Sequence, residues 1–319
     1  MIRLTEGVDG AVPAERAASV EMVRVSALIL PIYPWREGRH IWREAEDLGF
    51  HAAYTYDHLS WRDFRFGPWF GAVPTLTAAA AATGRLRLGT MVTSPNFRHP
   101  VTLAKDLIAL DDVSDGRITV GIGAGGIGFD ATVLGQEPWS TAERTERFEE
   151  FVPLLDRLLT DPVTTHHGKH YSAYEARMVP GCVQRPRLPL AVAATGPRGL
   201  ALAAAHGQAW ITTGPARKGD ETDPAEIPGI LAGQLAALDR ACAAVGRDSA
   251  ELSKILLTGF TQEAPLESVD AFTDFAGRYA EMGFDEIVVH RPVPGTCFDA
   301  GQGVWGKLPS AVSAIPRNC

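Results

Sequence analysis

The sequence lacks three features that mark broad protein classes: an apolar run that could span a membrane, a cluster of lysine and arginine, and closely spaced cysteines. A transmembrane helix needs about 20 mainly apolar residues, and no uncharged apolar run of that length occurs. The first residues also lack the basic segment and apolar core of a secretory signal. These absences predict a soluble, cytoplasmic protein with no membrane partner.

Acidic residues outnumber basic ones, 38 against 30, which gives a net charge of −8 at pH 7. A surface with this balance disfavours nucleic acid and anionic membranes as partners. The default partner is therefore a small molecule.

The distribution of cysteine and histidine gives no sign of a metal site. Four cysteines stand far apart without a C-x-x-C pair, which is typical of reduced thiols rather than of a disulfide framework or zinc site. His166, His167 and His170 lie in a polar stretch without a nearby group of carboxylates, and spacing alone is weak evidence for metal ligands. We interpret that stretch as a solvated loop.

Apolar segments suited to buried strands alternate with amphipathic segments along nearly the whole chain. Strands are predicted at 23–30, 51–59, 85–91, 118–122, 189–194, 208–213, 254–260 and 285–290. The clearest helix starts after Ser140, where the S-x-x-E spacing predicts a capping box. Eight strand–helix units fit a (β/α)8 TIM barrel better than an open doubly wound sheet, which usually has five or six strands.

The organisation along the chain predicts one large domain. Residues 1–22 form a polar leader that is either frayed or precedes a true start at Met22, and 23–319 form a single barrel. Long insertions follow the fourth strand, at 123–140, and the fourth helix, at 161–188. Residues 214–226 follow the sixth strand and are rich in glycine, proline and charge, which is typical of a mobile lid.

A glycine-rich segment, Gly123 to Gly128, matches the G-x-G-x-x-G dinucleotide fingerprint. Three strand–helix units precede it and no helix is predicted to begin inside it, so its context does not fit a Rossmann fold. Gly123 and Gly125 are better explained as backbone held close to a planar ligand.

Several strand ends carry polar or aromatic residues at the rim where barrels place their active sites. Asp57 and His58 end the second strand, and Trp61, Trp69 and Phe70 follow in a loop too aromatic for ordinary surface. Thr195, Gly196 and Arg198 join the fifth strand to a helix N-terminus, whose free N–H groups suit a phosphate; the third strand breaks off into the polar loop 90–99.

Taken together, these motifs resemble the luciferase-like monooxygenase superfamily, the flavin- and deazaflavin-dependent barrels. The resemblance covers about 23–291 and is carried by the following residues: Asp57-His58, 85–90 with 98–100, 114–117 leading to 121–123, Thr195-Gly196 and Thr212-Thr213-Gly214.

The resemblance implies roles for these residues. His58, beside Asp57, would be the catalytic acid or base. Thr90, Met91 and Val92 would form a bulge with a non-prolyl cis peptide at Met91-Val92, behind the flavin ring. Further cofactor contacts would come from Gly123, Gly125, Thr195, Gly196, Arg198, Thr212, Thr213 and Gly214.

Three functions stay open at this stage. The first is a reductase that passes hydride from coenzyme F420, a deazaflavin, to an unsaturated or carbonyl-bearing small molecule, with Arg217 and Lys218 holding the anionic tail. The second is a monooxygenase that uses reduced FMN and dioxygen, and the third is a flavin-binding barrel without catalysis. Relatives that oxidise a sugar phosphate have a Glu where this chain has Ala124, which disfavours that substrate. The resemblance also implies a homodimer.

Overall fold

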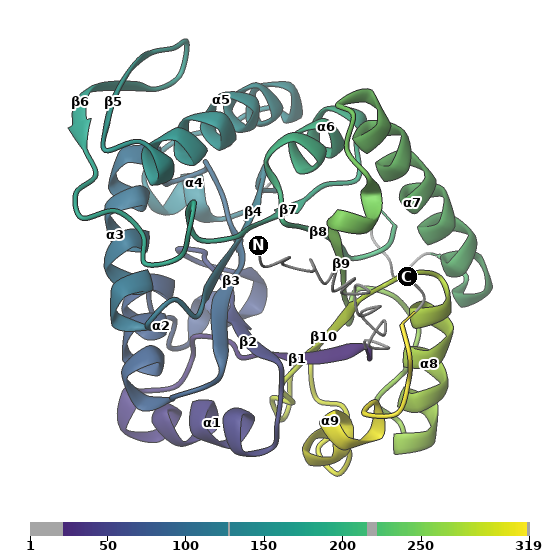
Figure 1. Ribbon diagram of the computed structural model, residues 1–319. Coiled ribbons are helices and arrows are strands. Elements are labelled where there is room, and N and C mark those ends of the chain that lie inside the picture. The colour runs from purple at the N-terminus through teal and green to yellow at the C-terminus, as the bar shows by residue number, and fades with distance from the viewer. Residues whose placement is uncertain (1–21, 127, 216–221, 318–319) are drawn as a thin grey trace, which may run out of the picture.

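A closed barrel of eight parallel strands forms the centre of the computed structural model, which describes residues 22–126, 128–215 and 222–317 (Figure 1). Around the barrel the strands follow the order β1-β10-β9-β8-β7-β4-β3-β2. They are β1 (Arg24–Leu28), β2 (Ala52–Thr55), β3 (Arg87–Thr93), β4 (Ile118–Gly123), β7 (Leu190–Ala193), β8 (Ala209–Thr212), β9 (Ser253–Leu257) and β10 (Glu286–His290). The predicted TIM barrel is confirmed, and all eight strands overlap the predicted segments.

Helices surround the barrel because each of the longer ones turns an apolar face toward the strands (Figure 1). They are α1 (Trp35–Asp47), α2 (Ala72–Ala82), α3 (Pro100–Val113), α5 (Thr141–Thr160), α6 (Pro197–His206), α7 (Ile227–Ala244) and α8 (Val269–Glu281), with the short α4 (Asp130–Val133) and α9 (Leu308–Ala311). Single 3-10 turns lie at Arg62–Phe66, Pro224–Glu226, Ser249–Glu251 and Trp305–Lys307. The Ser140 hydroxyl accepts the Glu143 N–H at 3.2 Å, as the predicted cap requires. None of the described helices is long and apolar enough to cross a membrane.

The two predicted insertions differ in structure. Between β4 and α5 the described residues form a loop and the single turn of α4. The insertion at 161–188 contains an antiparallel hairpin of β5 (Val163–His167) and β6 (Ser172–Arg177), which lies outside the barrel (Figure 1). The solvated-loop interpretation is therefore wrong for His166 and His170, which contact Glu150 and Glu146 of α5 at 3.2 and 3.5 Å.

Strands β3 and β4 approach each other closely at two glycines. A side chain at Gly89 would place its Cβ 2.1 Å from the Thr119 carbonyl oxygen, and one at Gly121 would lie 2.1 Å from that of Thr90. The strand register shifts between Thr90 and Thr93, and the Met91-Val92 peptide is cis. The bulge and the cis peptide implied by the resemblance are thus confirmed.

Some predictions concern residues outside the described part of the chain. Residues 1–21 of the leader belong to this group, as do residues 216–221 of the segment interpreted as a lid, which include Arg217 and Lys218. At the edge of the described chain, Met22 pairs with Pro316 in an antiparallel bridge.

Candidate active site

A cavity of about 580 Å³ opens at the carboxyl ends of β3, β4 and β7, the rim where barrels of this type carry their sites. Much of its wall is backbone, because glycines and small side chains dominate the lining. The lining residues are His58, Val92, Ser94, Gly123, Ala124, Gly125, Gly126, Thr141, Thr145, Phe148, Ala193, Ala194, Thr195, Gly196, Pro197, Arg198 and Gly199. Seven of the predicted cofactor and catalytic residues meet here: His58, Val92, Gly123, Gly125, Thr195, Gly196 and Arg198.

His58 is held by a carboxylate from the insertion after β4. Its Nδ1 lies 2.9 Å from Oδ2 of Asp130, and Oδ1 of the same carboxylate accepts the Leu59 N–H at 2.8 Å. Asp130 is buried, and the His58 backbone carbonyl accepts the Trp69 indole N–H at 2.7 Å. The imidazole is therefore fixed through one nitrogen, and Nε2 is left to exchange a proton.

Asp57 faces a different partner from the one expected of an Asp-His pair. Both of its carboxylate oxygens accept hydrogen bonds from Arg98, at 2.7 and 3.0 Å, and the carboxylate is buried. The fork geometry ties the end of β2 to the segment that leads into α3. Sequence reasoning missed Asp130, which lies 72 positions from His58 in an irregular insertion.

Of the residues at the end of β3, some line the cavity and others pack behind its wall. Val92 lines the cavity, and the buried Ser94 directs a hydroxyl group that has no partner among the described residues. Thr90 donates to the Gly121 carbonyl at 2.7 Å and Met91 packs inside the barrel, so that neither lines the cavity.

The N-terminus of α6 lies at the cavity, and its first backbone N–H groups are not bonded within the helix. The first intrahelical bond runs from the Leu200 N–H to Gly196, and no side chain caps the helix. The N–H groups of Arg198 and Gly199 precede that bond and suit an anion, since this end of a helix carries positive potential. The predicted helix start is present, and the phosphate at this position stays a prediction.

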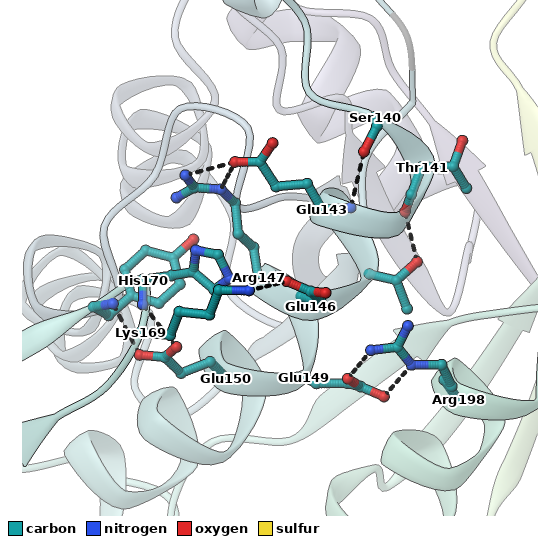
Figure 2. Close-up of polar contacts among 12 residues, drawn as sticks. Ser140, Thr141, Glu143, Glu146, Arg147, Glu149, Glu150, Lys169, His170 and Arg198 are labelled. Carbon is teal, nitrogen blue, oxygen red and sulfur yellow. Dashed lines mark hydrogen bonds and ion pairs between the residues drawn. The ribbon is translucent and has the colours of Figure 1, made fainter.

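The Arg198 side chain is occupied by an acidic neighbour. Figure 2 shows two parallel contacts between its guanidinium group and Glu149 of α5, and Nε lies 2.5 Å from Oε1. The hydrogen bond to Glu149 raises the pKa of Arg198. Glu146 of the same helix also raises this pKa, so Arg198 has a second acidic neighbour on α5.

The predicted pocket aromatics do not all gather in one place. Trp61 and Trp69 stack with centroids 6.4 Å apart and join Phe64 and Phe298. Phe70 instead lines a separate cavity of about 220 Å³ with Trp42. The structure therefore corrects the grouping of Phe70 with the two tryptophans.

Three predicted cofactor residues after β8 lie apart from the large cavity. Thr213 and Gly214 line a much smaller one, and Thr212 contacts Gln234 and the Gly214 N–H at 2.6 and 3.0 Å. Gln234 also donates to the Gly214 carbonyl at 2.6 Å. These contacts stabilise the turn itself.

Comparison with known proteins identifies the family of this chain. The sequence profile of the luciferase-like monooxygenase family matches residues 16–260. The chain belongs to this family. Among its relatives, the chain is similar to 4-hydroxyprotoasukamycin monooxygenase of Streptomyces nodosus subsp. asukaensis, with 35% identity over 64% of this chain and 56% of the relative. It is also similar to F420-dependent glucose-6-phosphate dehydrogenase of Beutenbergia cavernae (strain ATCC BAA-8), with 38% identity over 53% of this chain and 50% of the relative.

Solved structures share the fold of this luciferase-like protein. An F420-dependent secondary alcohol dehydrogenase in complex with an F420-acetone adduct superimposes with a TM-score of 0.75 at 18% identity, over 91% of this chain and 99% of the other. The resemblance drawn from the motifs is thus confirmed at the level of family and fold. The two curated relatives cited above are matched over only about half of their length, and they catalyse different reactions.

Proposed function

We propose that this protein is an oxidoreductase that transfers hydride between coenzyme F420 and an unsaturated or carbonyl-bearing small molecule. The observation that carries the proposal is the composition of one cavity: it brings together a carboxylate-held histidine and an uncapped helix N-terminus. Such a cavity can bind an anionic cofactor at one end and move a proton at the other.

The residues present fit a flavin-like group. The buried Ser94 hydroxyl lacks a partner, as expected for an atom that bonds a ligand, and Gly196 and Gly126 face open space. Gly123 and Gly125 let the backbone after β4 form the cavity wall without side chains. At Gly125 there is no room for one, since a Cβ would lie 2.5 Å from Asn96. Val92 would support one face of the ring, and the head of α6 would hold a phosphate.

When bound, the deazaflavin supplies a carbon that gives or takes hydride. His58 would hold the accompanying proton at Nε2, and Asp130 would orient the ring and stabilise its protonated form. Asp57 would act at a distance, because its ion pair with Arg98 positions the strand end that carries His58. Ala124, which stands where sugar-phosphate oxidising relatives have a Glu, offers no second acid at that point.

A specific observation favours the alternative, a monooxygenase that uses reduced FMN and dioxygen. The F420 tail carries several more negative charges than FMN, and Arg198, whose charge is paired with that of Glu149, does little to attract them. FMN needs only one phosphate site, which the head of α6 supplies.

The experiment that tests the proposal compares the two carriers directly. Titration of the purified protein should show tighter binding of F420 than of FMN, weakened by added salt, and turnover of reduced F420 should survive strict anaerobiosis. Product formation that needs oxygen and reduced FMN would replace the proposal with the monooxygenase. Binding without turnover by either carrier would favour the inactive barrel. The homodimer stays a prediction, which sedimentation velocity checks.

A further inference from the structure

A second cavity, of about 480 Å³, lies at the carboxyl ends of β9 and β10, and its charges disfavour an anionic ligand. Its described lining includes Glu263 and Glu267 but neither lysine nor arginine. His290 also lies in this wall, with Nε2 2.6 Å from the Tyr56 hydroxyl group. Burial lowers the pKa of His290 to about 3, so the imidazole is neutral at physiological pH. The phosphate group of a cofactor is therefore expected in the first cavity, beside β3, β4 and β7.

The surface of the first cavity supplies little positive charge for a phosphate. Arg198 is the one lysine or arginine among its described lining residues, and its guanidinium group is paired with Glu149. The head of α6 is equivalent to about half an elementary charge. A phosphodiester carries about one negative charge and a phosphomonoester about 1.5 to 2 at pH 7. A further cation close to the cavity is needed for the charges to balance.

Arg144, near the start of α5, is a buried cation. Only 8% of its surface is exposed, and burial lowers the pKa of its guanidinium group. Nη1 donates to the Trp139 carbonyl at 2.7 Å, and Nη2 donates to the Thr141 hydroxyl at 3.2 Å. Both acceptors are uncharged, so these bonds satisfy donors without neutralising the charge. Arginine is seldom buried unless an anion accompanies it.

Among the described residues, no carboxylate forms an ion pair with Arg144. The glutamates closest to it along the helix are engaged by other cations: Glu143 lies 3.0 Å from Arg147, and Glu146 lies 2.6 Å from Lys169. A buried charge without a counterion is costly, whereas the same charge beside an anion can be favourable. The described part of the chain thus leaves the charge of Arg144 for a ligand to neutralise.

Thr141, the first residue of α5, connects Arg144 to the first cavity, because it belongs to the lining. A hydroxyl group has one hydrogen and two lone pairs. Since Thr141 Oγ1 accepts from Arg144, its own hydrogen remains to be donated, and the described residues give it no acceptor. Thr145 also lines the cavity, but its hydroxyl donates to the Thr141 carbonyl at 2.8 Å. The hydroxyl of Thr141 is therefore a free donor that a buried guanidinium group polarises.

The head of α5 adds backbone donors to this hydroxyl. The Ser140 carbonyl accepts the Arg144 N–H at 2.9 Å, and the Ser140 hydroxyl accepts the N–H one residue earlier. The N–H groups of the first two residues of α5 precede these bonds and have no partner within the helix. Figure 2 shows Thr141 and Arg198 on the same side of α5, and both line the first cavity. Two helix N-termini, those of α5 and α6, thus border one cavity.

We propose that Arg144 is the buried counter-charge of the cofactor's phosphate group, which binds between the heads of α5 and α6 and accepts the hydrogen of the Thr141 hydroxyl. Thr141 touches the phosphate, and Arg144 acts through Thr141 and through its own field. The proposal rests on the proposed function only for the presence of a cofactor that carries a phosphate. It applies to the phosphodiester of F420 and equally to the phosphomonoester of FMN.

The test compares FMN with riboflavin in cofactor-free protein, because the two ligands differ only in the phosphate group. Fluorescence titration should give wild-type protein a lower Kd for FMN than for riboflavin. In Arg144→Met, which keeps an unbranched side chain and removes the charge, the Kd of FMN should rise about tenfold, as expected for one hydrogen bond to a charged group. The Kd of riboflavin should not change. A second titration repeats the comparison with F420 and a deazaflavin that lacks the phosphate and tail.

Three further variants separate the hydroxyl from the charge. Thr141→Val should weaken FMN and F420 binding, and Thr141→Ser, which keeps the hydroxyl, should bind both as wild type does. Arg157→Met is the matched control, because it removes one positive charge from the same helix, about 20 Å away at about 1.5 Å per residue. Its exposed pair with Asp161 lies outside the first cavity, so the preference for FMN should persist. Circular dichroism checks that each variant is folded.

Inorganic phosphate distinguishes a charge that binds ligand from one that only supports the fold. At equal ionic strength, replacing chloride by phosphate should raise the Tm of cofactor-free wild-type protein, because a ligand that binds the folded state stabilises it. The rise should be absent in Arg144→Met. If Arg144 only holds the Trp139 carbonyl, its substitution lowers the Tm by the same amount in both salts.

The inference is overturned if folded Arg144→Met keeps the preference for phosphate-bearing ligands, if riboflavin binding falls as much as FMN binding, or if Arg157→Met loses the preference as well. It is also overturned if wild-type protein binds none of these ligands. Failure of the proposed function looks different. In that case FMN binding depends on Arg144, while the protein neither binds nor turns over F420.

Discussion

The two cavities at the carboxyl ends of the barrel strands are lined by different kinds of groups. The one beside β3, β4 and β7 is walled by glycines, threonines and a helix N-terminus, so that backbone groups supply much of its polarity. The one beside β9 and β10 is lined mainly by apolar atoms, and its ionisable side chains include Glu263, Glu267 and His290. Backbone surfaces suit a cofactor with its own reactive atoms, whereas side chains can be exchanged to fit one substrate or another.

The largest expected effect separates chemistry from binding in the first cavity. His58→Asn should lower the turnover number about 100-fold or more, because the proton-transfer group is lost, while the cofactor Kd changes little. Single-turnover kinetics and titration measure the two quantities. Asp130→Asn should have a smaller effect, since it removes only the orienting carboxylate. An unchanged rate in His58→Asn would refute the assignment.

Asp57 should act on stability rather than on the chemical step. Asp57→Asn leaves the Arg98 guanidinium group without its buried counterion and should lower the free energy of unfolding by about 3 kcal/mol. Urea denaturation measures this loss. Glu143→Gln is the matched control, because its pair with Arg147 lies on the helix surface and should change stability by less than about 0.5 kcal/mol. Equal losses would contradict the distinction.

The burial of His290 beside the second cavity should make the free energy of unfolding depend on pH. The pKa of His290 is about 3 in the fold and about 6.5 in the unfolded chain, so below pH 6.5 the unfolded state binds the proton that the fold excludes. Stability should therefore fall as the pH drops from 6.5 toward 3, by at most about 1.4 kcal/mol per unit from this residue. Denaturation of wild type and His290→Phe at several pH values should show a shallower slope in the variant. Parallel slopes would mean that His290 is not buried and neutral.

The smallest effect concerns the choice of carrier in the first cavity. Glu149→Gln frees the Arg198 guanidinium group and should lower the Kd of F420 by about two- to fivefold, as expected for a half-exposed pair. FMN affinity should change less, because its phosphate is held by backbone N–H groups. Arg198→Ala should weaken F420 binding in turn. A weaker F420 complex in Glu149→Gln would show that Glu149 helps to hold the cofactor.

The backbone-built parts of the molecule were predictable from the sequence, and the side-chain partnerships were not. The strand–helix alternation predicted the barrel, and the glycines and the helix start at Gly196 lie at the cavity where the motifs placed them. Periodicity and strand-end position carry that information locally. By contrast, the partner of His58 lies in an irregular loop. The ion pair between Asp57 and Arg98 depends on how two loops pack together.

The same reasoning explains why the second cavity was missed. His290 ends a predicted strand, but nothing in its neighbourhood signals Tyr56, which is 234 positions away. The two residues meet only because β1 pairs with both β2 and β10, which closes the barrel.

The carboxylate that holds His58 comes from a loop, so it can change independently of the barrel. His58 lies three residues after the end of β2, whereas the carboxylate that holds it belongs to a single helical turn in the loop after β4. A change in the length or sequence of that loop can remove, replace or retune the carboxylate without disturbing any barrel strand. Descendants of one scaffold can in this way acquire different proton-transfer properties through an insertion alone, while the histidine and the cofactor wall stay as they are.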